Sequence, residues 1–216
     1  MRRQLLAFDL GAESGRAILG HLQDNTLELE EVHRFATGVT PVLGRLYWDV
    51  LRFFDEIQKG LQAASGHADL GSVGIDTWGV DYGLLTSDGA LLDNPRNYRD
   101  PRTAGVMERG LERVSRERVF AATGLQFMPI NTLWQLLSMK QSAAPQLATA
   151  QSLLMIPDLL HYFLTGERCS EFTNATTTQF YDPRQRRWST ELFEAFDLPK
   201  HILPEIIEPG TRLGLI

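Results

Sequence analysis

Asp9-Leu10-Gly11-Ala12-Glu13-Ser14-Gly15-Arg16 is the stretch that decides the fold, because it places a carboxylate at the end of an apolar run and two glycines around a tight turn. The run Leu5–Leu10 predicts a short buried strand, and residues 17–22 predict a second strand directly after the turn. The two strands therefore form an antiparallel hairpin rather than a strand-to-helix crossover.

This loop also has the composition of a phosphate-binding turn. The glycines let backbone N–H groups approach anionic oxygens, Ser14 adds a hydroxyl donor, Arg16 adds positive charge, and Asp9 is suited to hold Mg²⁺ through water. The P-loop spacing and the G-x-G-x-x-G spacing are both absent, which removes the main support for those two nucleotide-binding interpretations. From these residues alone, an ordinary glycine-bounded hairpin stays an equal alternative.

The next elements are predicted from hydrophobic periodicity. A third strand covers residues 26–35, and its alternation changes phase before Val32, which indicates a β-bulge. A helix begins at about Asp49 and stops at Gly66, with an apolar face formed by Leu51, Phe54, Ile57, Leu61 and Ala64. A strand over 72–76 and a hairpin over 82–89 follow.

Helical patterns dominate from Pro101 to Gly166. One helix is predicted from Pro101 to about Gly124, with Val106, Leu111, Val114 and Val119 on its apolar side. Further helices begin at Asn131 or Thr132 and at Pro157, and a short one covers residues 189–196. This order predicts a ribonuclease H-like α/β domain whose mixed sheet opens with three antiparallel strands and which carries an α-rich insertion.

Composition excludes several classes of function. The 216 residues are 43% hydrophobic and 22% charged, which is typical of a globular protein, and the net charge of -6 disfavours sequence-independent binding to nucleic acid or to an anionic membrane. Pro157 and Asp158 interrupt the longest apolar stretch, so we expect no membrane span. Cys169 is the only cysteine, which fits a cytoplasmic protein, and the five histidines show no zinc-binding spacing.

A second segment, Gly74-Ile75-Asp76-Thr77-Trp78-Gly79-Val80-Asp81, together with the Asp9 loop resembles the FGGY family of sugar kinases. Its T-W-G-V-D form resembles the rhamnulokinases among them. The similarity continues in the same order along the chain through residues 97–103, 123–127, 131–133, 157–158, 164–166 and 173–179.

The resemblance implies ATP and Mg²⁺, with Asp9 near the metal and the phosphates surrounded by Ala12, Glu13, Ser14, Gly15 and Arg16. It implies that Gly79 contacts the sugar, so that a side chain there should damage sugar affinity with little loss of stability. Further candidates for the sugar pocket are Trp78, Asp81, Tyr98, Arg99 and Asn131. Aromatic rings suit the C–H faces of a sugar, and amides and charged groups suit its hydroxyls. From the residues alone, core aromatics and a surface Arg99–Asp100 ion pair stay open alternatives.

For the whole protein, the resemblance implies ATP-dependent phosphorylation of L-rhamnulose to L-rhamnulose 1-phosphate. Residues 1–216 would be the N-terminal domain of a longer kinase, with the catalytic base and the adenine site beyond Ile216, so this part alone is expected to be inactive and to expose a surface that promotes self-association. Its oligomeric state is not predicted. The alternatives are a kinase of fuculose, xylulose or ribulose, a non-catalytic protein with the actin-like ATPase fold, and a sugar-sensing module.

Overall fold

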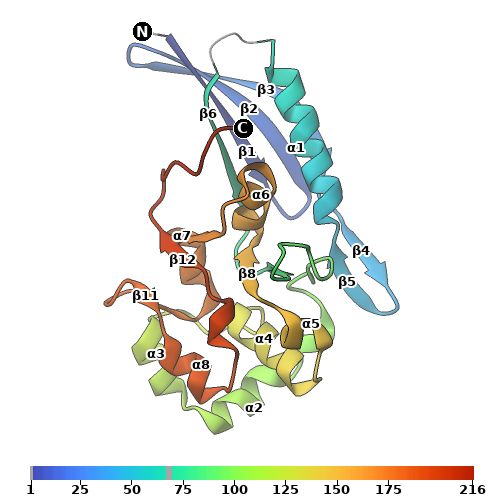
Figure 1. Cartoon of the computed structure of the whole chain (residues 1–216), viewed down its shortest axis with the longest axis vertical. Helices are drawn as coiled ribbons and strands as arrows, with labels where there is room; N and C mark the ends of the chain where they lie inside the picture. The colour runs from blue at the N-terminus through green and yellow to red at the C-terminus, as the bar shows by residue number, and fades with distance from the viewer. Residues whose placement is uncertain (1, 67–69) are drawn as a thin grey trace. The chain divides into compact units, whose positions relative to one another are not determined.

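The computed structural model describes residues 2–66 and 70–216, and the chain forms two compact units (Figure 1). The sheet unit contains the residues up to Thr40 and Trp48–Trp78, and the helix-rich unit contains Pro41–Tyr47 and Gly79–Ile216. His67, one of the five histidines, lies outside the described residues.

The sheet unit is built on four strands in the order β3-β2-β1-β6. The strands β1 (Arg2–Leu10), β2 (Ser14–Gln23) and β3 (Thr26–Ala36) pair antiparallel, and β6 (Leu70–Thr77) returns parallel to β1. This confirms the predicted opening of three antiparallel strands. The predicted bulge is also confirmed, because Ala17 pairs with His33 and Ile18 with Glu31, which leaves Val32 unpaired.

Helix α1 (Val50–Ala64) packs on the sheet of this unit, and Asp49 caps it by accepting a hydrogen bond from the N–H of Arg52 at 3.2 Å. Its buried residues are Val50, Phe53, Ile57, Gly60 and Ala64. The predicted face was therefore wrong in part, since Leu51 is 59% exposed. Gly60 explains the shift: a Cβ there would lie 2.6 Å from Phe8 Cε1, so the helix approaches the sheet along its glycine side. The last helical residue is Ala64, Ser65 is the C-cap, and Gly66 follows directly after it.

The two faces of the sheet differ, as alternation along a strand requires. Leu6, Phe8 and Leu10 of β1 are buried, while the residues between them are exposed or half-buried. Asp9 pairs with Arg16 on one side and with Asp76 on the other, so all three residues lie on the face opposite the buried one. The sheet therefore brings Asp9, Arg16 and Asp76 together at the carboxyl end of β1.

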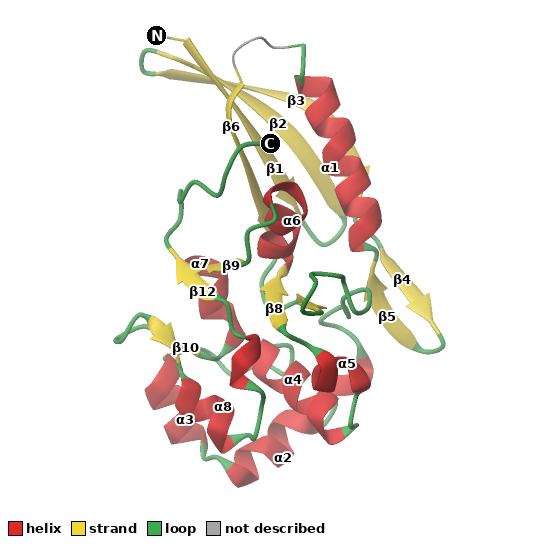
Figure 2. Ribbon diagram, in the orientation of Figure 1, coloured by secondary structure: helices red, strands yellow, loops and turns green. Residues whose placement is uncertain are grey.

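Helices are the main regular elements of the helix-rich unit, and long loops connect them, as Figure 2 shows. Its longest strands, β7 (Tyr82–Leu85) and β8 (Ser152–Met155), pair antiparallel, and the predicted hairpin after β7 is present as a turn closed by a Leu85–Leu91 bridge. Its helices are α2 (Val106–Arg113), α3 (Arg116–Thr123), α4 (Thr132–Gln141), α5 (Pro145–Thr149), α6 (Ile156–Thr165), α7 (Phe172–Ala175) and α8 (Thr190–Ala195).

Short elements complete the structure. The strands β9 (Cys169–Glu171) and β12 (Glu205–Ile207) pair in parallel, and β10 (Tyr181–Asp182) pairs with β11 (Arg187–Trp188). Another two-stranded sheet contains β4 (Val39–Val42) and β5 (Arg45–Trp48). Single 3-10 turns cover Pro101–Thr103, Thr176–Thr178 and Lys200–Ile202.

The single helix predicted from Pro101 to Gly124 was wrong. Val114 is extended, with φ -129° and ψ 116°, and the helical stretch therefore divides into α2 and α3. Ser115 begins α3 by accepting a hydrogen bond from the N–H of Arg118 at 3.3 Å, and a serine that can cap a helix competes with continuing the previous one. Gly124 ends α3 in the left-handed conformation, as predicted.

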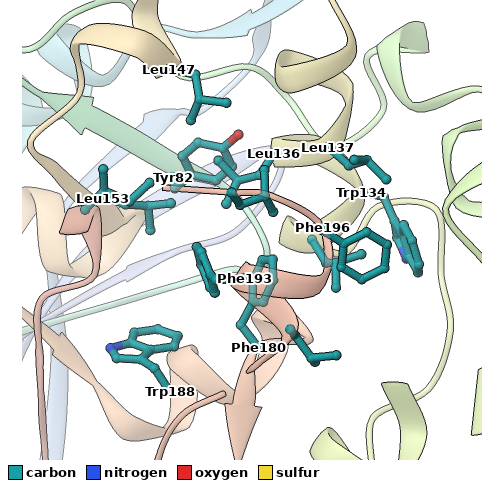
Figure 3. Packing of buried hydrophobic residues seen from close by; sticks show 14 of the residues in the cluster. Tyr82, Trp134, Leu136, Leu137, Leu147, Leu153, Phe180, Trp188, Phe193 and Phe196 are labelled. Carbon is teal, nitrogen blue, oxygen red and sulfur yellow. The ribbon is translucent and has the colours of Figure 1, made fainter. Parts of the chain in front are cut away.

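Large aromatic side chains fill the core of the helix-rich unit (Figure 3). The ring centroids of Phe180 and Phe193 lie 4.1 Å apart, and Trp134 meets Phe196 edge to face at 5.9 Å. The first contact joins the segment after the Thr176–Thr178 turn to α8, and the second joins the first turn of α4 to the end of α8. Within the two described ranges, no helix combines the length and the apolar character needed to cross a bilayer.

Candidate functional site

The Asp9 loop of the sheet unit is held by backbone and side-chain hydrogen bonds. The N–H of Gly11 donates to the Ser14 carbonyl at 2.9 Å, and the buried Thr37 donates its hydroxyl to the Gly11 carbonyl at 2.6 Å and its N–H to the Glu13 carbonyl at 3.1 Å. Thr37 was not predicted to support this loop, because it lies beyond the end of the third strand. These hydrogen bonds fix the loop backbone at Gly11, directly after β1, and at Glu13, directly before β2.

Gly15 is required by packing. A Cβ at this position would overlap the ring of Phe35, which pairs with Gly15 across β2 and β3. The glycine thus lets an aromatic ring cover the base of the loop, and a larger residue here would push the ring away.

Arg16 donates a hydrogen bond from Nη2 to Asp9 Oδ2, and both side chains stay open to solvent, at 40% and 46% exposure. The exposed Asp76, which was not a predicted site residue, lies beside Asp9 in the neighbouring parallel strand. Among the residues that the structure describes, no three His, Cys, Asp or Glu side chains form a group that would hold a metal by themselves. One or two carboxylates nevertheless suffice for Mg²⁺ when phosphate oxygens complete its coordination. The carboxylates at this strand end fit that role.

Trp78 also belongs to the sheet unit, where it packs with other aromatic side chains. Its ring centroid lies 4.2 Å from that of Trp48, and Phe53 meets it edge to face at 6.2 Å. The ring is half-buried, so one part of it stays accessible while the rest contributes to this aromatic cluster.

Asp81 is fully buried in the helix-rich unit. Its Oδ1 accepts a hydrogen bond from Gln135 Nε2 at 3.0 Å, and its Oδ2 accepts one from the N–H of Tyr98 at 3.1 Å. A buried carboxylate with these partners fixes the backbone at Tyr98. Burial also raises the pKa of the adjacent Tyr82 to about 12, so its phenol stays protonated, and it contacts Met139 Sδ at 3.2 Å.

Gly79 lies against Thr177. A Cβ at Gly79 would lie 2.7 Å from Thr177 Cγ2 and 2.8 Å from its Oγ1. Such a contact forces the threonine to move, so the expectation that a side chain at Gly79 leaves stability intact is at odds with the packing.

Asn131 is the N-cap residue of α4, as predicted, but its side chain makes no capping hydrogen bond. It is fully buried, and its Nδ2 donates to the Gln126 carbonyl at 2.9 Å and to Gln179 Oε1 at 3.2 Å. Its Oδ1 is buried without a hydrogen-bond partner. Asn131 therefore joins the start of α4 to the segment that follows the Thr176–Thr178 turn.

Tyr98 and Arg99, together with Gly79, are the accessible sugar candidates in this unit. Tyr98 is half-buried, Arg99 is exposed, and the Arg99 guanidinium lies 5.2 Å from the Tyr98 ring centroid. The alternative of a surface Arg99–Asp100 ion pair is not favoured, because Asp100 is 2% exposed and lies within 4 Å of Arg45 and Arg96 instead.

A cavity of about 220 Å³ lies in the helix-rich unit, lined in part by Arg45, Arg96 and Arg102. Gly79, Asp81, Tyr98, Arg99 and Asn131 are not among the residues that line it. Hydrogen bonds connect these sugar candidates in other ways: Asp81 binds the backbone of Tyr98, and α4 begins at Asn131 and supplies Gln135 to Asp81. Gln135 and Thr177 were not predicted, although a glutamine among the leucines of α4 is the one sequence signal that marks a buried polar contact.

Residues 4–216 match the model of the FGGY family of carbohydrate kinases, N-terminal domain. The rhamnulokinase of Oceanobacillus iheyensis is 40% identical over 216 residues, which cover 99% of this chain and 46% of that protein. The rhamnulokinase of Bacteroides thetaiotaomicron is 39% identical over 217 residues, which cover 100% of this chain and 45% of that protein. The chain thus spans less than half the length of these curated relatives.

Solved structures show the same fold at low sequence identity. The gluconate kinase of Lactobacillus acidophilus has a TM-score of 0.88 at 19% identity, with 100% of this chain and 44% of that chain covered. The glycerol kinase of Plasmodium falciparum with ADP has a TM-score of 0.79 at 17% identity, with 100% and 45% covered. The predicted fold class is confirmed. Since the family model matches the chain from residue 4 to its last residue, the chain belongs to the FGGY family of carbohydrate kinases.

Proposed function

We propose that the protein containing this chain transfers the terminal phosphoryl group of ATP to L-rhamnulose, giving L-rhamnulose 1-phosphate and ADP. The observation that carries this proposal is the identity of about 40% with curated rhamnulokinases over the length of the chain. The solved structures at 17–19% identity support only the fold.

The nucleotide phosphates bind at the Asp9 loop in this proposal. Residues 12–16 surround the phosphates: the backbone N–H groups of the turn before β2, the Ser14 hydroxyl and the Arg16 guanidinium are the donors. Asp9 would hold Mg²⁺, with Asp76 as its carboxylate neighbour. When bound, the metal neutralises charge on the phosphates. Support comes from the exposure of Asp9 and Arg16 and from the hydrogen bonds that fix the loop backbone.

The sugar contacts Gly79, Tyr98 and Arg99 of the helix-rich unit in this proposal. Asp81 and Asn131 are fully buried, so in this proposal they act indirectly, by holding the backbone and side chains of their neighbours in place. At such a site, backbone carbonyl and guanidinium groups bind the hydroxyls of the sugar, and aromatic rings cover its C–H faces.

We place the proton-accepting base and the adenine site in the part of the kinase that the curated relatives have beyond the matched residues. Residues 1–216 act as one N-terminal domain, to which both units belong, and do not turn over alone. Its oligomeric state is left open. A cytoplasmic location fits an ATP-dependent enzyme whose one cysteine, Cys169, is buried and free.

The test is a panel of ketoses with the purified full-length protein and MgATP, with ADP release as the readout. We expect kcat/KM for L-rhamnulose to exceed that for L-fuculose, D-xylulose and L-ribulose by roughly tenfold or more. Faster turnover of another ketose would replace the substrate and keep the kinase. ATP hydrolysis that does not depend on sugar would instead favour a protein with the actin-like ATPase fold that is not a sugar kinase.

A further inference from the structure

Val80 has an unusual backbone conformation. Its φ is +68°, in the left-handed region, although its side chain is branched at Cβ and 7% exposed. A β-branched residue in this region is a conformational outlier, because its side chain collides with its own backbone. Such a residue persists only where its surroundings hold it, and it lies between Gly79 and Asp81 in the sequence.

Three side chains hold both peptide groups of Val80. Thr132 Oγ1 and Gln135 Nε2 donate to the Val80 carbonyl at 2.7 and 3.1 Å, and both come from α4. On the other side, the N–H of Val80 donates to Thr177 Oγ1 at 3.0 Å. The Thr177 hydroxyl itself donates to the Asn174 carbonyl at 2.8 Å, so its lone pair is turned toward Val80.

This arrangement extends to both neighbours of Val80. Thr177 packs against Gly79, where a Cβ would lie 2.7 Å from its Cγ2. Gln135 Nε2 also contacts Asp81 Oδ1 at 3.0 Å, and Asp81 Oδ2 in turn accepts from the N–H of Tyr98. The same contacts that hold Val80 therefore set the positions of Gly79 and of the Tyr98 backbone.

We propose that Thr132, Gln135 and Thr177 are positioning residues that keep Val80 left-handed and thereby fix Gly79 and Tyr98 against the sugar, an inference that rests on the proposed function. No sequence pattern predicted a role for any of these three residues. Without them Val80 relaxes to an ordinary conformation, the peptide planes on either side rotate, and Gly79 moves away from its place. Sugar affinity then falls, whereas nucleotide binding, which belongs to the Asp9 loop, does not change.

The variants Thr132→Val and Thr177→Val in the full-length protein test this, because valine keeps the shape of threonine and removes its hydroxyl. We expect KM for the ketose to rise roughly three- to tenfold in each, as for loss of one hydrogen bond, with KM for ATP unchanged. The matched controls Thr132→Ser and Thr177→Ser keep the hydroxyl and should stay within about twofold of wild type. Two sites on opposite sides of Val80 are used so that one unfolded variant does not end the test.

A rescue experiment separates positioning from simple packing. Glycine adopts the left-handed region without strain, so Val80→Gly combined with Thr132→Val should recover ketose KM toward the wild-type value. If the threonine contributes only packing, removing the Val80 side chain adds a second defect and KM does not recover.

The two proposals fail in distinguishable ways. A wild-type protein that phosphorylates no ketose contradicts the proposed function, and this inference falls with it. If wild type phosphorylates a ketose, the variants are assayed on the best one, and unchanged KM in both valine variants, or an equal rise in the serine and valine variants, overturns the positioning role.

Discussion

Asp9 and Arg16 lie opposite each other beside the turn of the β1–β2 hairpin, each with nearly half of its side chain exposed. The glycines and the strand end that place them were readable from sequence because they are contiguous. Asp76 was not included in the site because its position beside Asp9 depends on the parallel pairing of β6 with β1, over strands far apart in the chain.

Asp9→Asn in the full-length protein tests the phosphate site. We expect kcat to fall roughly 30- to 1000-fold, because loss of one charge contact to the transferring group commonly costs about 2–4 kcal/mol in the transition state. Stability should stay within about 1 kcal/mol of wild type, since the pair with Arg16 is exposed. A folded variant with near-normal turnover at saturating Mg²⁺ would remove Asp9 from the site.

Gly79 illustrates a residue for which sequence reasoning predicted contact with the sugar but missed packing. Thr177 lies where a Cβ would be, and no local pattern reveals a neighbour 98 positions later along the chain. Asp81, another candidate for the sugar pocket, likewise has a partner that no local pattern reveals, because Gln135 lies 54 residues later in the chain.

We therefore expect Gly79→Ala to lower the free energy of unfolding by about 1–3 kcal/mol, as overpacking does, measured by urea denaturation. Thr177→Ser removes the nearest contact atom, Cγ2, and should relieve part of the cost when combined with Gly79→Ala. Equal stability of Gly79→Ala and wild type would show that the segment yields easily, and the sugar contact alone would then account for the glycine.

At the scale of elements, α1 and the α2–α3 pair show where periodicity stops being sufficient. Two overlapping apolar stripes run along α1, and Gly60, which was not counted as apolar, decides which of them meets the sheet. Between α2 and α3 the apolar positions continue in helical spacing, but the capping bond of Ser115 ends the run. The antiparallel pairing of β1, β2 and β3 was predicted because turn residues and alternation are local signals. The pairing of β7 with β8 and of β9 with β12 joins strands far apart in the chain and was not predicted.

The junction of α6 with β9 contains a buried carboxyl group. Asp158 accepts hydrogen bonds from Ser170 Oγ at 3.1 Å and from the N–H of Glu171 at 3.0 Å, yet burial dominates and raises its pKa to about 7 from 3.8. The folded protein thus binds one more proton than the unfolded chain between these two values. This contribution to stability is complete below about pH 4 and is lost as pH rises through about 7.

In the variant Asp158→Asn, the free energy of unfolding should therefore fall less as pH rises. Relative to wild type, we expect the variant to gain on the order of 2 kcal/mol between pH 5 and pH 8, measured by urea denaturation at both values. The control Glu167→Gln changes an exposed carboxylate between α6 and β9. It should leave the difference in the free energy of unfolding between the two pH values unchanged. Parallel pH profiles for wild type and Asp158→Asn would show that Asp158 is ionised in the folded protein.

At the scale of the molecule, the family could be identified from sequence because its motifs are local and lie in order along the chain, and the family model matches residues 4–216. The arrangement of polar side chains around Val80 could not be predicted from sequence, because Thr132, Gln135 and Thr177 meet Val80 only after the helix-rich unit has folded.

Residues 1–216 alone should turn over at least about 100-fold more slowly than the full-length kinase, because phosphoryl transfer requires close alignment of donor and acceptor and misplacement by about 1 Å costs that much. ADP release by the two purified proteins under identical conditions measures this. Turnover of the shorter chain within about tenfold of full length would place the base inside these residues.

The most direct test of the central claim is L-rhamnulose-dependent ADP release by the full-length protein with MgATP, with the sugar product identified by NMR. The account predicts one ADP for each L-rhamnulose consumed, with the phosphate on the oxygen at C1. Absence of sugar-dependent ADP release from folded protein, or a phosphate at another position, would contradict it.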